Sequence, residues 1–364
     1  MKRIQVYTLF LLSVACTACG QNKTNPPHEN LNRHRSGVPE SQLKDAAASK
    51  VPMSMVRNVK QARNGDILIA SYIGVYRYNG ESFTNVTRTI EWPTFWDVLE
   101  DRKGNLWLAS QDSGVYLQPA GQNGFKLFKP SDGTGITSAL HIYEDRAGNI
   151  WFGANRWDGK SLRTFTTDDG FPTNHIRLLL EDKTGKLWFG AQGEDMFVYD
   201  GQGKTLPTGQ AGFTVLKNKD GNAFNNVWSV IEDKKGNIWF GADGLWRYEP
   251  SASLGTGPSA SHGAGTFTKV SERGAYAIIQ DKEGNIWTTG GVNQNVWALS
   301  RYDAKSLYSE KPDVTEIMSG PPAFLALMEA ADGSIWFGGL GAQSGVYRYD
   351  GKTVTDFKSK DGQK

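Results

Sequence analysis

The hydrophobic and polar positions of this chain follow one pattern that occurs seven times. A short apolar run precedes a polar turn, and a second apolar run follows it, as in "WSVIEDKKGNIWFGA" (228–242). Short apolar runs bounded by turn residues predict β-strands rather than helices. The polar turns of the seven copies start at Gln61, Glu100, Glu144, Glu181, Glu232, Gln280 and Glu329.

Each copy also carries the signals of tight hairpins. In the turn after Glu232, Asp233 can accept hydrogen bonds from backbone amides, and Gly236 can adopt a left-handed conformation. The run "IWFGA" that follows is apolar at consecutive positions, which is typical of a strand covered on both faces. Segments such as "GVYRYNG" (74–80) and "SFTNVT" (82–87) supply a third and an outer strand. Each repeat therefore predicts a sheet of four antiparallel strands.

The spacing of the copies indicates how these sheets assemble. The tryptophan after each turn, or Leu68 in the first copy, recurs at intervals of 37 to 51 residues. A period of about 40–50 residues with several strands per repeat is typical of a β-propeller. We predict an all-β fold, a seven-bladed β-propeller with four antiparallel strands per blade, over residues 51–364. The third copy has "NRWDGKSL" after Ala154 and predicts a truncated third blade.

The composition and motifs of the chain mainly exclude certain classes of partner and site. The 364 residues carry a net charge of +2 that is spread along the chain, so nothing indicates a nucleic-acid partner. The Asp-x-x-Gly-Asn turn has too few oxygen ligands for a calcium loop. The sequence contains neither a phosphate-binding glycine loop followed by lysine nor a nucleophile elbow. We therefore expect no metal site and no cofactor.

The N-terminus has the features of a processing signal. Lys2 and Arg3 precede an apolar run over residues 4–15, which is too short to span a bilayer, and Cys16 and Cys19 follow. This arrangement resembles a bacterial lipoprotein signal. We predict a signal peptide over residues 1–19 that ends at a lipidated Cys19, with Cys16 or an ordinary signal peptide as alternatives. Residues 20–50 are then a flexible tether, and the protein is expected at the bacterial cell envelope, at the outer membrane or the periplasmic face, touching the membrane only through its lipid.

The stretch "EDKKGNIWFGA" followed by "GLWRYEP" resembles the two-component regulator propeller repeat, and the resemblance extends over about residues 51–364. It implies a seven-bladed propeller of the kind found in extracytoplasmic sensors of hybrid histidine kinases and in stand-alone secreted proteins. The sequence shows no kinase or membrane-spanning helix after the seventh copy, so a signalling role is expected to pass through an envelope signalling or uptake partner. A second likeness, through "GNIWF", is to the streptogramin B lyase family, whose activity implies a catalytic histidine and a glutamate near a metal.

Candidate site residues are expected in the loops that lead into the inner strands, at the mouth of the central channel. Those loops are rich in aromatic residues, whose flat faces suit sugars or peptide segments. Trp96, Trp228 and Tyr276 could instead pack between blades, and the two histidines could be structural. Glu194 is the acid considered beside them. The residues proposed to bind ligand are Trp92, Phe95, Trp96, His141, His175, Trp228, Tyr276 and Phe324.

Taken together, these features favour a non-catalytic ligand-binding module over an enzyme, and no catalytic residue is assigned. A glycan is the leading ligand, and a protein partner is the next. A metal-dependent lyase or hydrolase and a protein-binding scaffold are the alternatives.

Overall fold

The structure is a computed structural model, and it describes residues 50–90, 94–130, 133, 135–169, 171, 177–191, 193–199, 213–250, 265–293, 295–321, 323–341 and 344–358. The chain divides into Met1–Val38 and Pro39–Lys364, and every described residue lies in the second unit. The predicted signal peptide with Cys19, and the tether up to residue 49, lie outside the described residues. The division into signal, tether and propeller stays a prediction at its N-terminal boundaries.

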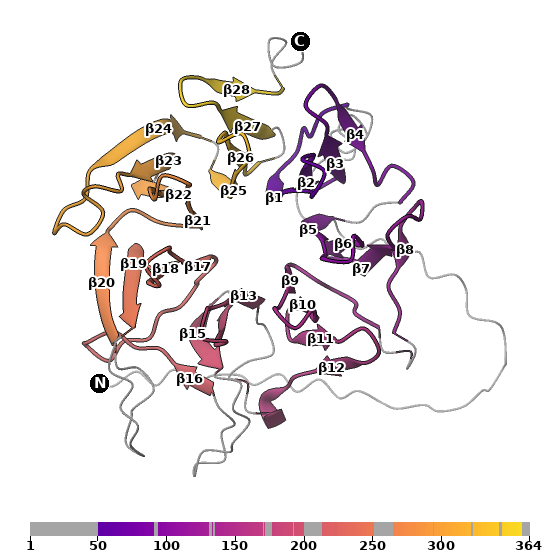
Figure 1. Cartoon of the computed structure of the whole chain (residues 1–364), viewed down its shortest axis with the longest axis horizontal. Coiled ribbons are helices and arrows are strands. Elements are labelled where there is room, and N and C mark those ends of the chain that lie inside the picture. The colour runs from indigo at the N-terminus through magenta and orange to yellow at the C-terminus, as the bar shows by residue number, and fades with distance from the viewer. Residues whose placement is uncertain are drawn as a thin grey trace, which may run out of the picture. The chain divides into compact units, whose positions relative to one another are not determined.

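Seven four-stranded antiparallel sheets make up the fold, and strands follow chain order within each sheet (Figure 1). The innermost strands are β1 (Val56–Gln61), β5 (Phe95–Glu100), β9 (Ile142–Glu144), β13 (Arg177–Glu181), β17 (Val230–Glu232), β21 (Ala277–Gln280) and β25 (Phe324–Glu329). The second strands are β2 (Ile67–Ser71), β6 (Leu106–Ser110), β10 (Ile150–Phe152), β14 (Leu187–Ala191), β18 (Ile238–Gly241), β22 (Ile286–Asn293) and β26 (Ile335–Gly339).

The third strands are β3 (Gly74–Tyr78), β7 (Gly114–Gln118), β11 (Asn155–Trp157), β15 (Glu194–Tyr199), β19 (Leu245–Pro250), β23 (Val296–Tyr302) and β27 (Val346–Tyr349). The outer strands are β4 (Phe83–Asn85), β8 (Lys126–Leu127), β12 (Leu162–Thr164), β16 (Phe213–Val215), β20 (Gly265–Ser271), β24 (Val314–Gly320) and β28 (Val354–Asp356). A short 3₁₀ helix, η1 (Thr167–Asp169), follows the third sheet. All four strands of that sheet have three residues, which confirms the predicted truncation.

The sheets form a ring around a central axis. Each innermost strand contacts the innermost strands of the two adjacent sheets, and β1 contacts β25 (Figure 1). The predicted seven-bladed β-propeller is confirmed. Because the first and last sheets each consist of four consecutive strands, the ring closes without a shared strand.

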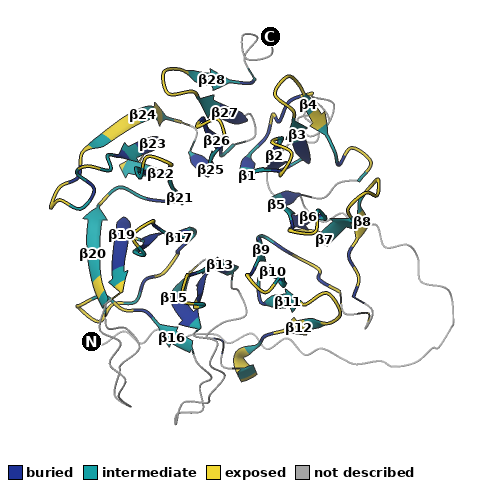
Figure 2. Cartoon of the chain, in the orientation of Figure 1, coloured by how far each residue is buried: buried dark blue, intermediate teal, exposed yellow. Residues whose placement is uncertain are grey.

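Packing between neighbouring sheets supplies the core. The second strands β2, β6 and β26 are buried at every residue, whereas exposed residues concentrate in turns and outer strands (Figure 2). A hydrophobic cluster fills each interface between adjacent sheets, and at the seam it joins Val56 and Val59 to Ala326 and Trp336. Burial on both faces explains why the "IWFGA" strands are apolar at consecutive positions.

The repeated aspartate both closes its turn and holds the tryptophan of the next strand. Asp233 accepts a hydrogen bond from the backbone N–H of Asn237 at 2.8 Å and from the indole Nε1 of Trp239 at 2.8 Å. In the seventh sheet alanine takes the place of the aspartate, and Trp336 donates to the Ser334 hydroxyl at 3.0 Å instead. The indole-to-carboxylate bond recurs at Trp107, Trp151, Trp188 and Trp287.

The residue before that aspartate links its sheet to the preceding one. The Glu232 carboxylate accepts a hydrogen bond from the backbone N–H of Lys183, in the turn of the fourth sheet, at 2.8 Å. Gln61 of the first sheet accepts one from Ala331 of the seventh at 2.8 Å, so this chain of hydrogen bonds also closes. The remaining donor–acceptor pairs are Arg63–Glu100, Arg102–Glu144, Arg146–Glu181, Lys234–Gln280 and Lys282–Glu329.

Candidate functional site

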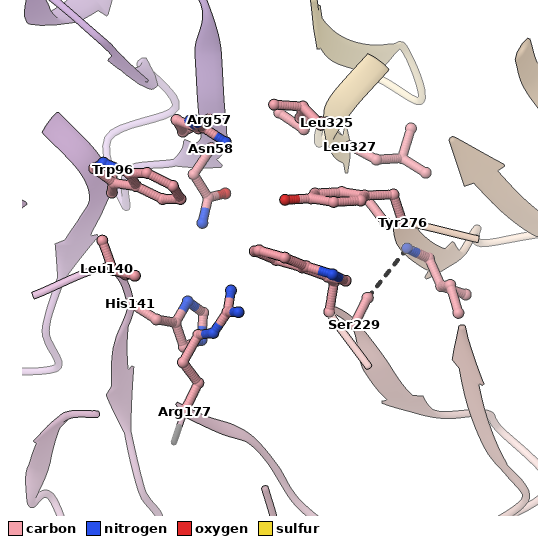
Figure 3. A pocket seen from close by; sticks show the side chains of 14 residues that line it. Arg57, Asn58, Trp96, Leu140, His141, Arg177, Ser229, Tyr276, Leu325 and Leu327 are labelled. Atoms are coloured by element: carbon pink, nitrogen blue, oxygen red, sulfur yellow. Dashed lines mark hydrogen bonds between the residues drawn. The ribbon is translucent and has the colours of Figure 1, made fainter. Parts of the chain in front are cut away.

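A cavity of about 160 Å³ lies where the innermost strands begin, at the end of the ring opposite the repeated turns (Figure 3). Each sheet contributes one lining side chain from the same repeat position, four residues before the repeated Glu or Gln. The seven residues at this position are Arg57, Trp96, Leu140, Arg177, Trp228, Tyr276 and Leu325. One position of the repeat, varied from copy to copy, therefore forms the wall of the cavity.

The structure separates the predicted site residues into three groups. Trp96, His141, Trp228 and Tyr276 line the cavity. Trp92 and His175 lie outside the described residues, so their placement stays a prediction.

Phe95 and Phe324 form the third group, and neither lines the cavity. Their side chains are 1% and 0% exposed, and they pack edge-on against Tyr116 and Phe337 respectively. The pairing of β5 with β6 shifts register between Phe95 and Asp97, which places Trp96 at a β-bulge. There Phe95 packs into the interface between sheets while Trp96 faces the cavity. Neither phenylalanine is therefore placed to contact a ligand in the cavity.

Two arginines that the sequence analysis did not select occupy the cavity. The guanidinium carbon of Arg57 lies 3.7 Å from the ring centre of Trp96, whose indole Nε1 donates to Gln111 at 2.8 Å. The guanidinium carbon of Arg177 lies 3.9 Å from the ring centre of Trp228. Each arginine thus packs on the indole from the next sheet, which holds its side chain in place.

Trp228 and Tyr276 extend this packing to the sixth sheet. Their ring centres are 4.7 Å apart with an interplanar angle of 23°, so the rings are stacked. The Tyr276 hydroxyl points into the cavity (Figure 3). Burial raises the pKa of Tyr276, while the positive charges of Arg57 and Arg177 oppose that rise. Both guanidinium groups therefore act on one phenol.

Partial burial also alters the arginines. Burial lowers the pKa of Arg57, and it lowers the pKa of Arg177 to about 10, with the charge of Arg57 acting in the same direction. Both groups remain cations at neutral pH, yet each has lost part of its hydration.

A fully buried carboxylate lies behind the lining residues. Asp97 contacts the Lys60 ammonium at 3.0 Å and the His141 Nδ1 at 2.9 Å, and it accepts a hydrogen bond from Asn58 at 2.7 Å. Burial by itself would raise the pKa of Asp97, but the charges of Lys60 and His141 and the hydrogen bonds outweigh it and hold the pKa at about 2. Asp97 orients His141 and neutralises Lys60.

Sequence reasoning missed Arg57 and Arg177 because it searched the loops for aromatic residues. The repeat itself carried the signal that would have found them. Aligning the copies on the repeated Glu or Gln and reading four residues back gives two arginines among two tryptophans, a tyrosine and two leucines. Within the described ranges, no three His, Cys, Asp or Glu side chains are grouped so that they could hold a metal ion.

The comparison with protein families confirms the predicted resemblance. The family model described as "Two component regulator propeller" matches residues 170–193 and 221–244, which contain the turns at Glu181 and Glu232. No curated protein matches the chain.

Solved structures with the same fold include the extracellular domain of the putative hybrid two component system BT3049 from B. thetaiotaomicron. The TM-score is 0.62 and the identity 19%, over 82% of this chain and 39% of that one, so this chain spans less than half of that domain's length. Streptogramin B lyase has a TM-score of 0.54 at 14% identity, over 82% of this chain and 94% of the lyase.

PorZ from Porphyromonas gingivalis, whose structure is described as that of an essential bacterial surface component of the type-IX secretion system, has a TM-score of 0.54. Its identity is 14%, over 80% of this chain and 46% of PorZ. At these identities the likenesses establish the fold. In the part of the chain that the structure describes, no helix has the length and apolar character needed to cross a bilayer.

Proposed function

We propose that this protein is an envelope-anchored, non-catalytic propeller that binds a glycan in the cavity at the start of its innermost strands and signals through a partner. The observation that carries the proposal is the cavity itself, in which side chains from all seven sheets meet. Loops and strand ends of rigid β-folds are common binding sites. The fold shared with an extracellular domain of a putative two component system supports a sensory role. A protein segment is the next candidate ligand.

Binding measurements on the purified protein test the glycan. We expect a glycan array to give a specific signal, and calorimetry with the selected glycan to show weaker binding for Trp96→Ala and Trp228→Ala. Each substitution removes an indole that supports an arginine in the cavity. Trp157→Ala, on β11 away from the cavity, is the control for loss of an indole. Absence of binding to every glycan would reject the glycan and leave the protein ligand to be sought by cross-linking.

The membrane anchor is tested separately. Fatty-acid labelling in a bacterial host should mark the wild-type protein and fail to mark Cys19→Ala. Label that persists in Cys19→Ala and disappears in Cys16→Ala would move the anchor to Cys16. Absence of label in the wild-type protein would reject the lipid anchor and favour an ordinary signal peptide.

One observation supports a second candidate function, an enzyme of the lyase or hydrolase kind. His141 lines the cavity, and its Nδ1 is held by Asp97 at 2.9 Å, as in histidines that act as general bases. If the protein turns over its bound glycan, His141→Gln should abolish product formation and leave binding in place. Recovery of the glycan intact after prolonged incubation with wild type would reject this candidate.

A further inference from the structure

The cavity contains more positive charge than the surrounding side chains neutralise. Among the described residues, neither Arg57 nor Arg177 pairs with a carboxylate, and the Arg57 Nε is buried without a hydrogen-bond partner. Asp97, the buried carboxylate behind the lining residues, contacts Lys60 and His141 instead. Arg57, Arg177 and Lys60 carry three positive charges and Asp97 carries one negative charge. When His141 is neutral, this group of side chains therefore has a net charge of +2.

From this geometry we infer that the cavity binds an acidic sugar, whose carboxylate is held between Arg57 and Arg177. This deepens the proposed function and rests on its glycan. A buried cation without a counter-ion is costly, and an anionic ligand offsets that cost. The planar guanidinium group pairs with a carboxylate through two parallel hydrogen bonds, so two arginines can hold one carboxylate firmly.

The positions of the two arginines suit a single anionic group. They come from the first and fourth sheets, both line the cavity, and the Tyr276 hydroxyl points into it (Figure 3). A phenol hydroxyl is a hydrogen-bond donor, so it can donate its proton to an oxygen of the ligand. Two guanidinium groups and one phenol hydroxyl thus line the same cavity.

A cation lies on one face of each cavity indole, where a sugar could otherwise stack. Arg57 covers Trp96, and Trp228 contacts both Arg177 and Tyr276. The indole rings therefore position the guanidinium groups, and we expect the charged guanidinium groups to contact the ligand. Packing on the face of an indole leaves the N–H donors at the edge of a guanidinium group uncovered by the ring.

The size of the cavity limits what enters. Its volume of about 160 Å³ is smaller than the roughly 300–1,000 Å³ of pockets that enclose drug-sized ligands. One terminal sugar residue with its carboxylate suits this space better than an internal segment of a chain. We therefore expect recognition of a uronate at the end of an oligosaccharide.

Calorimetry on protein expressed from the full-length sequence tests the inference with paired ligands. The probes are acidic oligosaccharides selected from an array of uronate-terminated glycans, and the same oligosaccharides after reduction of the carboxylate to an alcohol. Removing one partner of a buried charge pair costs about 2 kcal/mol or more, so the reduced ligands should bind at least about 30-fold more weakly. Equal binding of both forms would overturn the inference and leave the glycan-binding function standing.

Variants test the arginines directly. Arg57→Gln and Arg177→Gln should each lower affinity for the acidic ligand at least about 30-fold. Arg177→Lys keeps the positive charge but cannot form two parallel hydrogen bonds, so its affinity should lie between those of wild type and Arg177→Gln. Arg163→Gln, an exposed arginine paired with Asp169 on the rim of the third sheet, is the matched control and should bind as wild type does. Unchanged affinity in both cavity variants would overturn the inference.

A folding readout separates lost binding from lost structure. Because Arg177→Gln removes a partly buried cation that has no counter-ion, the unliganded variant should melt at or above the wild-type temperature while binding is lost. If Arg177→Gln melts at a lower temperature than wild type, the affinity of Arg177→Lys is used instead. Wild-type affinity in Arg177→Lys would show that Arg177 makes no bidentate contact with the ligand carboxylate. An acidic peptide that binds more tightly than every uronate would assign the cavity to protein segments. Failure of all glycans, neutral and acidic alike, would reject the proposed function with it.

Discussion

At the scale of single residues, Asp97 is the carboxylate on which the charge balance beside the cavity depends. It is fully buried, and Lys60 and His141 contact it from the first and third sheets. Its backbone partner Ile142 donates to it at 2.9 Å, which ties the second sheet to the third. One buried carboxylate therefore holds three sheets together and positions the histidine of the site.

Replacing Asp97 with Asn should destabilise the fold in a pH-dependent way. Its pKa of about 2 in the folded protein lies below the ordinary value of about 3.9, so the ionised form stabilises the fold above that value. This shift corresponds to about 2 kcal/mol at neutral pH, which is lost as the pH falls toward about 2. We expect Asp97→Asn to lower the free energy of unfolding by about 2–3 kcal/mol at pH 7, measured in urea.

The pH series distinguishes charge from packing in that experiment. The difference between wild type and Asp97→Asn should shrink between about pH 4 and pH 2, because protonation removes the same charge from wild type. Asp66→Asn, a partly exposed carboxylate 3.1 Å from Arg77, is the control and should cost less than about 1 kcal/mol. A difference that stays constant with pH would contradict an electrostatic role for Asp97.

At the scale of elements, the hairpin between the first and second strands is the unit that repeats. Within the hairpin, the aspartate binds turn amides and the indole; toward the preceding sheet, the Glu or Gln accepts a backbone N–H. Gln61 and Gln280 make that link through an amide oxygen, so the link requires an acceptor and no negative charge. The side chain of the residue after the aspartate reinforces it, as Lys183 does with the Asp233 carbonyl at 3.2 Å.

Substitutions at Glu232 should follow this logic. Glu232→Gln keeps the acceptor for the Lys183 N–H and should stay within about 0.5 kcal/mol of wild type, because its exposed ion pair with Lys183 contributes little. Glu232→Ala leaves that N–H without its partner and should cost about 1–1.5 kcal/mol. Chemical denaturation of both variants measures the two costs. Equal costs would mean that the charge, and not the acceptor, makes the link.

At the scale of the whole molecule, the ring has one seam, between the last sheet and the first. No strand crosses it, so close packing and the hydrogen bond from Ala331 to Gln61 hold it shut. Gly338 on β26 lies directly against Val56 on β1: a Cβ at Gly338 would be 2.4 Å from the Val56 Cγ1 and 2.9 Å from its carbonyl oxygen. The glycine of "WFGG" therefore permits the approach that closes the ring.

Gly338→Ala should consequently weaken the seam. A methyl group cannot fit unless β1 and β26 move apart, and overpacking of this kind costs about 1–3 kcal/mol. Gly135→Ala is the control, because a Cβ there meets nothing within 4 Å, and it should be neutral or slightly stabilising. Thermal unfolding compares the two variants, and limited proteolysis would report opening of the seam. Equal stability of the two variants would contradict the role of Gly338.

The repeat predicted the strands, the turns and the number of sheets because these depend on neighbouring residues. Short apolar runs between polar turns, the Asp-x-x-Gly turn and the period of the tryptophans are all local properties, and the ring follows from repeating them. The role of Glu232 could not be predicted in the same way, since its partner Lys183 is 49 residues away in another sheet.

The site depended on tertiary structure for the same reason. Trp96, Trp228 and Tyr276 line the cavity, whereas Phe95, which the sequence placed beside them, is buried next to the β-bulge at Trp96. The packing of Arg57 on Trp96 likewise could not be predicted, because the two residues lie in different copies of the repeat. Sequence alone determined the repeating frame, because strand and turn preferences act between near neighbours. Only closure of the ring decided which seven side chains meet in the cavity, because it brings together one residue from each distant copy.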